Sequence, residues 1–81
     1  SQDDFIPLGR EFDAMRDYLL IENIRLRDKL EFHCEIDEQA RAVPVPGIIL
    51  QPLVENAVKY GLDTSEPPLR INVHVTCHDA T

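Results

Sequence analysis

The chain has 81 residues, a formal net charge of −7, and a composition of 43% hydrophobic and 28% charged residues. This composition is typical of a small globular domain with one core, and the negative charge argues against nucleic acid or an anionic membrane surface as a partner. No apolar run approaches the roughly 18 residues that a membrane span needs, so we expect no membrane segment within the chain.

The two cysteines, Cys34 and Cys77, do not form a CxxC pair. Their sparse placement favours reduced thiols, and therefore a cytoplasmic location for this region. A parent protein that is held in the inner membrane by other segments remains compatible with this expectation.

Residues 1–7 are expected to be a loose lead-in, after which apolar residues recur at helical spacing. One stripe consists of Leu8, Phe12, Met15 and Leu19. The pattern predicts an amphipathic helix from about Gly9 to Leu26, whose broad apolar face needs a partner surface.

Alternating apolar and polar residues predict two half-buried strands, at Leu30–Asp37 and Leu69–His78. Between them, helical spacing predicts a second helix that begins at about Gly47 and ends at Gly61, where glycine would provide a left-handed cap. The composition of Asp63–Pro68 indicates a loop.

The order helix, strand, helix, strand would by default suggest a βαβ unit with parallel strands. Both predicted strands alternate cleanly, however, and clean alternation is typical of a sheet with one wet face. We therefore expect an α+β fold with antiparallel or mixed pairing.

The second predicted helix, LQPLVENAVKYG, carries the residues with the clearest chemistry. Asn56, Lys59 and Tyr60 are spaced i, i+3 and i+4, so they share one edge of the helix. An amide oxygen there can ligate a hard cation, and an ammonium group can meet a phosphate. A core helix with a solvated polar face would show the same spacing, so spacing alone does not decide between the two interpretations.

The string QPLVENAVKYG resembles the N-box of LytS/YehU-type sensor histidine kinases, which belong to the GHKL (Bergerat-fold) ATPase superfamily. Upstream, EFDAMRDYLLIENIRLRDKLEF is similar to the family's linker before the ATP-binding domain. The resemblance implies that residues 1–29 are the linker helix at the end of the dimerisation and phosphoacceptor region. It implies that residues 30–81 are the N-terminal portion of the ATP-binding (HATPase) domain, an incomplete α/β sandwich.

The resemblance also implies a role for each polar residue of the motif. Asn56 would hold the magnesium ion that bridges the phosphates of ATP, while Lys59 would lie near the phosphates and Tyr60 near the nucleotide. Glu55 would be the catalytic residue, either polarising the accepting histidine or ordering a metal-bound water. The parent would be a protein-histidine kinase, a phosphoprotein that passes phosphate to a response regulator.

Two positions depart from the family pattern. Pro52 stands where many relatives in the superfamily have a carboxylate or amide, so any acid–base role would fall on Glu55 or Gln51. Arg27 follows the first predicted helix where the family tends to have glycine. That helix end would therefore lack the favoured left-handed cap.

Two family motifs do not occur in these 81 residues. The phosphoacceptor motif of the kind HFLFN is absent, and Gly9, Gly47 and Gly61 cannot form the family's glycine-rich ATP boxes. We expect the chain alone to be inactive as a kinase, with neither ATP nor magnesium bound. The signal that the parent senses and the regulator that it addresses are not encoded in any motif here.

The sequence disfavours both a zinc-binding site and a site for nucleophilic catalysis. Strand alternation places histidines and cysteines on opposite faces of the sheet, with His33, His74 and His78 against Cys34 and Cys77. The same separation argues against a Cys–His nucleophile, and Ser1 and Ser65 both lie in predicted loops.

The competing interpretation is a non-catalytic dimerisation or interaction module. An uncovered sheet face and unpaired strand edges invite association with another chain. We therefore expect a homodimer or a domain-swapped assembly, which could also use the stripe of Leu8, Phe12, Met15 and Leu19.

Overall fold

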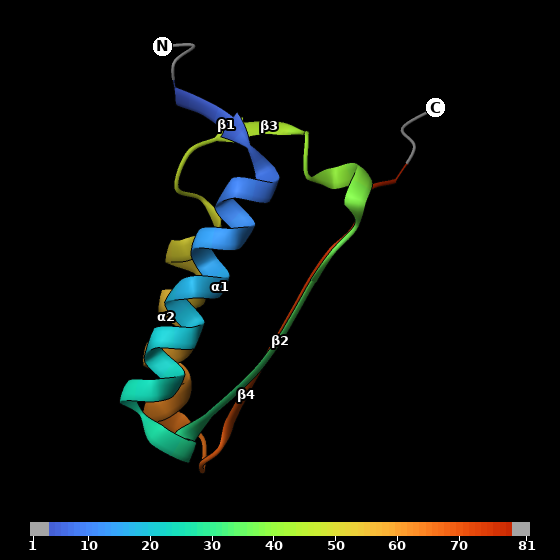
Figure 1. Cartoon of the computed structure of the whole chain (residues 1–81). Helices are drawn as coiled ribbons and strands as arrows, with labels where there is room; N and C mark the ends of the chain where they lie inside the picture. The colour runs from blue at the N-terminus through green and yellow to red at the C-terminus, as the bar shows by residue number, and fades with distance from the viewer. Residues whose placement is uncertain (1–3, 79–81) are drawn as a thin grey trace.

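The structure, a computed structural model, describes residues 4–78 as two helices packed against a parallel pair of strands, with a short second strand pair at the start of the first helix (Figure 1). In chain order the elements are β1 (Phe5–Pro7), α1 (Leu8–Arg25), η2 (Arg27–Lys29), β2 (Leu30–Ile36), η3 (Glu38–Ala40), β3 (Pro44–Pro46), α2 (Leu50–Thr64) and β4 (Leu69–Val75). The predicted α+β class is confirmed.

The core lies between the two helices and the apolar face of the β2–β4 pair. Its buried residues are Phe12, Met15 and Leu19 from α1, Val54 and Val58 from α2, and Leu30 and Ile71 from the strands. The apolar stripe of α1 thus finds its partner within the same chain. Met15 and Leu19 are both 0% exposed, so in this packing they face the interior of the same chain. The expectation of a homodimer or a domain-swapped assembly stays a prediction.

Residues on both sides of the predicted boundary between 1–29 and 30–81 contribute to this one core. The helix α1 contacts both α2 and β2. The division into a linker helix and an ATP-binding portion stays a prediction, but within residues 4–78 the two parts pack as one unit.

The strands β2 and β4 pair in parallel, from Leu30 opposite Leu69 to Ile36 opposite Val75. The expectation of antiparallel or mixed pairing is therefore wrong for this pair. Helix α2 lies in the connection between the two strands, as parallel pairing requires. Alternation of apolar and polar residues indicates that one face of a sheet is covered and the other is exposed. It does not indicate the direction of the neighbouring strand.

The apolar and polar residues of β2 and β4 alternate because one face of this strand pair is uncovered and polar. Across the two strands, Arg70 Nε lies 3.2 Å from Glu31 Oε1, and His74 Nε2 lies 3.5 Å from Glu35 Oε1. Along β2, His33 Nε2 lies 2.8 Å from Glu35 Oε2, and this hydrogen bond is the main reason why the pKa of Glu35 is lowered. Exposed pairs of this kind contribute little to stability.

The second strand of the pair is shorter than predicted, because β4 ends at Val75. Its partner β2 ends at the same register position, so no ladder partner remains for Thr76 and Cys77. Hydrogen bonds to Asp37 take the place of the strand ladder there. Its backbone N–H donates to the Val75 carbonyl at 2.9 Å, and its carboxylate accepts from the Cys77 N–H at 3.1 Å.

The lead-in is more ordered than expected, because β1 pairs antiparallel with β3. Phe5 lies opposite Pro46 and Pro7 opposite Pro44. This pairing brings the segment before α2 to the start of α1, where the carbonyl of Val43 accepts the Leu8 N–H at 2.8 Å. Residues 1–3 of the predicted lead-in lie outside the described part of the chain.

The C-terminal end of α1 turns through Arg27, whose φ of 54° is in the left-handed region. The chain therefore adopts at Arg27 the conformation that the family supplies with glycine. A residue with a Cβ pays an energetic penalty there of about 1 kcal/mol.

We expect Arg27→Gly to raise the free energy of unfolding by about 0.5 to 1 kcal/mol, because glycine removes this strain. Urea unfolding followed by circular dichroism measures the effect. Arg25→Gly, in the last helical position of α1, is the matched control and should lower stability instead. A loss of stability in both variants would contradict the strained turn.

Helix α2 begins and ends later than predicted. It starts at Leu50 and continues through Gly61 to Thr64, and none of the three glycines has a positive φ. The prediction that Gly61 is a left-handed cap is wrong. A Cβ on Gly61 would come within 2.6 Å of both terminal methyl groups of Leu69, so glycine here allows the start of β4 to approach the helix closely.

Candidate functional site at the start and outer edge of α2

The start of α2 is capped by a residue that is distant in sequence. No side chain of α2 itself caps the helix. Instead, the carboxylate of Glu11, from the first turns of α1, accepts the backbone N–H groups of Ile48 at 2.7 Å, Ile49 at 2.6 Å and Leu50 at 3.0 Å. Glu11 is the one buried charged side chain among residues 4–78, with 6% exposure. An anion at this position meets both the unpaired N–H groups and the positive end of the helix dipole.

Two further features of the same turn fit this cap. Ile48 has a φ of 61°, a strained conformation for a β-branched residue, and this conformation aims its N–H at Glu11. Pro52 lies in the first turn of α2, where the missing N–H of proline costs least. Pro52, which departs from the family pattern, has no backbone N–H, so the first turn of α2 has one unpaired hydrogen-bond donor fewer.

The ionisation of Glu11 is controlled by burial and by these hydrogen bonds. Burial alone would raise the pKa of Glu11, but the bonds from Leu50, Ile49 and Ile48 outweigh it, so the pKa is lowered. A carboxyl group with a lowered pKa stabilises the folded state above its unfolded pKa. This contribution is lost as the pH falls through the folded pKa.

We therefore expect the stability difference between the wild-type chain and Glu11→Gln to be largest near neutral pH. It should shrink as the pH falls below about 4, where Glu11 becomes protonated in the unfolded and then in the folded chain. Urea unfolding at a series of pH values measures this difference. A difference that stays constant down to the acid range would show that the charge of Glu11 contributes nothing.

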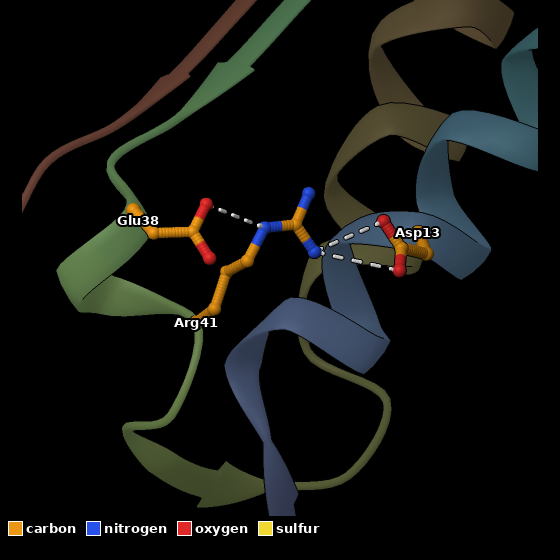
Figure 2. Close-up of polar contacts among 3 residues, drawn as sticks. All are labelled: Asp13, Glu38 and Arg41. Atoms are coloured by element: carbon orange, nitrogen blue, oxygen red, sulfur yellow. Dashed lines mark hydrogen bonds and ion pairs between the residues drawn. The ribbon is translucent and has the colours of Figure 1, made fainter.

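The segment that leads to α2 is held against α1 by Arg41 (Figure 2). Its guanidinium Nη1 lies 3.4 Å from Asp13 Oδ1, its Nε lies 3.8 Å from Glu38 Oε1, and the group is 5.7 Å from the centre of the Phe12 ring. Gly9 makes room for it, because a Cβ there would meet the Arg41 side chain at 3.0 Å. Arg41 and Glu11 thus attach the same segment to the first turns of α1.

The three residues predicted to bind nucleotide lie on exposed surface. Asn56, Lys59 and Tyr60 share the outer edge of α2, as their spacing predicts, and Tyr60 is 61% exposed. Within residues 4–78 the Asn56 side chain makes no hydrogen bond, so its carbonyl oxygen is available to a ligand. The Lys59 ammonium lies 6.0 Å from the centre of the Tyr60 ring.

Glu55 lies beside Lys59 on the side of α2 that faces α1. Glu55 and Lys59 line a groove of about 300 Å³ between α1 and α2, together with Tyr18 and Glu22. Burial, followed by the charges of Glu22 and Glu55, raises the pKa of Tyr18. Gln51 Nε2 donates to Glu55 Oε2 at 3.1 Å, so the two candidates for an acid–base role contact each other.

A second groove of similar volume is mainly apolar and runs between α2 and β4. Leu53 and Ala57 line it from the helix, Val73 lines it from the strand, and Met15 lines its floor. Leu53 is 65% exposed. The face of α2 next to Asn56 is therefore apolar surface that no other part of residues 4–78 covers.

Residues 4–78 include most of the side chains considered for zinc binding or nucleophilic catalysis. No group of three or more His, Cys, Asp or Glu side chains there could hold a metal ion, and Cys34 and Cys77 are free. Burial raises the pKa of the Cys34 thiol, which disfavours a nucleophilic thiolate. Ser65 follows α2 directly, and Ser1 lies outside the described residues.

No helix between residues 4 and 78 has the length and apolar character needed to cross a membrane.

Sequence reasoning missed Glu11 and Arg41, which organise the start of α2. Glu11 has a weak signal in the sequence, since it is a charged residue directly beside the predicted apolar stripe. Nothing local indicates its partners, because they lie 37 to 39 residues away.

The search of curated proteins finds proteins similar to this chain. No family model matches the chain, and no solved structure matches it significantly. The Sensor protein kinase HptS of Staphylococcus aureus is 36% identical over an aligned length of 81 residues, and the figures are the same for strains USA300, NCTC 8325 / PS 47 and COL. The alignment covers 91% of this chain but 16% of the relative. Over nearly its whole length, the chain is thus similar to one segment of a sensor protein kinase.

Proposed function

We propose that the chain is the N-box region of the ATP-binding domain of a LytS/YehU-type sensor histidine kinase in a two-component system. The observation that carries the proposal is the 36% identity to a sensor protein kinase over 91% of the chain. The parent would transfer phosphate from ATP to a histidine and then to a response regulator. In this proposal the region is cytoplasmic, whether or not the parent is anchored in the inner membrane.

The outer edge of α2 supports the proposal, because its residues fit the phosphate end of a magnesium nucleotide. Asn56 offers an uncommitted amide oxygen, the kind of ligand that Mg²⁺ accepts, and Glu55 offers a carboxylate one position away. Lys59 places an exposed ammonium group on the same edge, where it can meet phosphate oxygens.

Each of these side chains would have a distinct task in phosphoryl transfer. Bound magnesium would neutralise charge on the transferring phosphate. Asn56 would orient the ion, Lys59 would hold the phosphates by charge, and Tyr60 would pack beside the nucleotide. Glu55 accepts a hydrogen bond from Gln51, which orients its carboxylate for a role toward the accepting histidine or a metal-bound water.

The 81 residues alone are expected to bind little ATP and to have no kinase activity. All three glycines serve the framework of the fold: Gly9 makes room for Arg41, Gly61 for Leu69, and Gly47 donates its N–H to the Asp4 carbonyl at 2.8 Å. None of them is available for a loop that holds phosphates.

Calorimetry with magnesium and ATP tests the proposal, using this chain and the longer protein, each with and without Asn56→Ala. We expect binding by the longer protein, loss of that binding in the variant, and none by the 81 residues. Asn56→Gln is the matched control, because it keeps the side-chain amide and lengthens the side chain by one methylene group. A folded longer protein that binds no nucleotide would contradict the ATPase assignment.

An interaction module is the second candidate, and one surface favours it. Leu20, Ile21 and Ile24 lie on the outer side of α1 with exposures of 45%, 64% and 79%. Exposed apolar residues that cluster in this way are typical of association surfaces. Sedimentation of the chain, with and without Ile21→Ser/Ile24→Ser, tests for self-association. A wild-type chain that stays monomeric at high concentration would exclude the module.

A further inference from the structure

The contact between Glu11 and α2 links the proposed nucleotide edge to the other helix. One buried carboxylate accepts the N–H groups of three consecutive residues at the start of α2, all within 3.0 Å. Leu50 is the first residue of the helix, and Asn56 follows fewer than two turns later, about 9 Å along the axis. An α-helix is stiff over this length, so the position of its first turn is transmitted to Asn56.

We propose that Glu11 is a positioning residue for the nucleotide site: it fixes where α2 begins and how its first turn is oriented, and thereby holds Asn56, Lys59 and Tyr60 in register for magnesium-ATP. This role rests on the function proposed above. Glu11 touches neither metal nor nucleotide in this proposal, and it acts through the backbone of α2 alone.

The fully buried side chains of α2 hold its middle, and its first turn has fewer packing contacts. The residues of the helix that are buried in the core, Val54 and Val58, lie in its second and third turns. Leu53 is 65% exposed, and Ile48, which precedes the helix, is 74% exposed. Side-chain packing therefore fixes the middle of α2, while the Glu11 carboxylate holds its beginning together with the partly buried side chain of Leu50.

The turn at Ile48 is strained, so the start of α2 depends on the hydrogen bonds that the charged carboxylate of Glu11 accepts. Its left-handed φ of 61° is costly for a β-branched residue and persists only where the surroundings hold it. Glutamine in place of Glu11 keeps the shape but presents an N–H₂ group to N–H donors. The three bonds cannot all survive this change.

The test compares Glu11→Gln with the wild-type protein in full-length form, at a temperature where circular dichroism shows both fully folded. The measured quantity is the Kd for magnesium-ATP. We expect roughly a tenfold to hundredfold weakening, the loss typical of removing a group that orients a metal ligand. Glu66→Gln, at an exposed glutamate in the loop that follows α2, should leave the Kd unchanged.

A stabilising second substitution separates positioning from stability. Arg27→Gly lies at the far end of α1 and relieves strain there, so Glu11→Gln/Arg27→Gly should regain stability without regaining affinity. Recovery of affinity together with stability would overturn the positioning role, as would a folded Glu11→Gln protein that binds like the wild type. Absence of binding by the wild-type protein would overturn the proposed function and this role with it. Wild-type binding that only Asn56→Ala abolishes would overturn the role of Glu11 alone.

Discussion

Glu11→Ala is expected to lower the free energy of unfolding of this chain by about 3 kcal/mol, since unsatisfied buried donors each cost about 1 to 3 kcal/mol and water can reach some of them. The substitution removes the acceptor of three backbone N–H groups and leaves the left-handed turn at Ile48 unsupported. A chain of this length has a total stability of about 4 to 12 kcal/mol, so the loss is a large part of it.

Urea unfolding at neutral pH measures this loss, with Glu38→Ala as the control at an exposed glutamate in the neighbouring 3₁₀ turn. The control should change stability by less than about 0.5 kcal/mol, as surface substitutions usually do. Equal effects of the two substitutions would mean that the cap at the start of α2 does not form in solution.

Leu19→Ala should destabilise the chain by about 3 to 4 kcal/mol, the usual cost of emptying a fully buried leucine site. Leu20→Ala on the same helix is the matched control, because the residue type is the same and the exposure is 45% instead of 0%. We expect it to cost less than about 1 kcal/mol. This pair of variants tests which face of α1 packs inside the chain.

The outcome of that comparison decides between two interpretations of the apolar stripe. If the stripe joined two copies of the chain, the loss in Leu19→Ala would depend on protein concentration. Because the stripe packs on α2 and the sheet, the loss should be independent of concentration. A smaller effect at Leu19 than at Leu20 would contradict the described core.

Periodicity was sufficient to predict α1, α2 and most of β2 and β4, because each has one face in the core and one outside it. It could not predict that the two strands run parallel, since alternation has the same form in both directions. It also placed the end of β4 too late. Cys77 continues the apolar alternation, but the partner strand has already ended at Ile36.

The ends of the helices were harder to predict, because contacts far apart in sequence decide them. Gly61 has the residue type of a cap but serves the approach of Leu69, and Arg27 takes the left-handed turn without being glycine. The start of α2 depends on Glu11, which lies in another helix. Sequence patterns within a short window contain none of these contacts.

The candidate site was predicted in part. The spacing of Asn56, Lys59 and Tyr60 gave their common edge, because helical geometry alone fixes it. The motif associated Glu55 with them, and in the structure Glu55 accepts a hydrogen bond from Gln51 and lines the groove beside Tyr18 together with Lys59. The binding of nucleotide at this edge stays a prediction.

The most direct test of the central claim is nuclear magnetic resonance of the longer protein with ¹⁵N-labelled asparagine side chains, titrated with manganese and ATP in place of magnesium and ATP. Paramagnetic broadening should remove the side-chain amide signal of Asn56, which Asn56→Ala identifies. The signals of Asn23 on α1 and of Asn72 on the open sheet face, opposite His33, should broaden less than that of Asn56. Broadening of Asn72 with Asn56 left sharp would place the metal on the sheet and contradict a nucleotide site on α2.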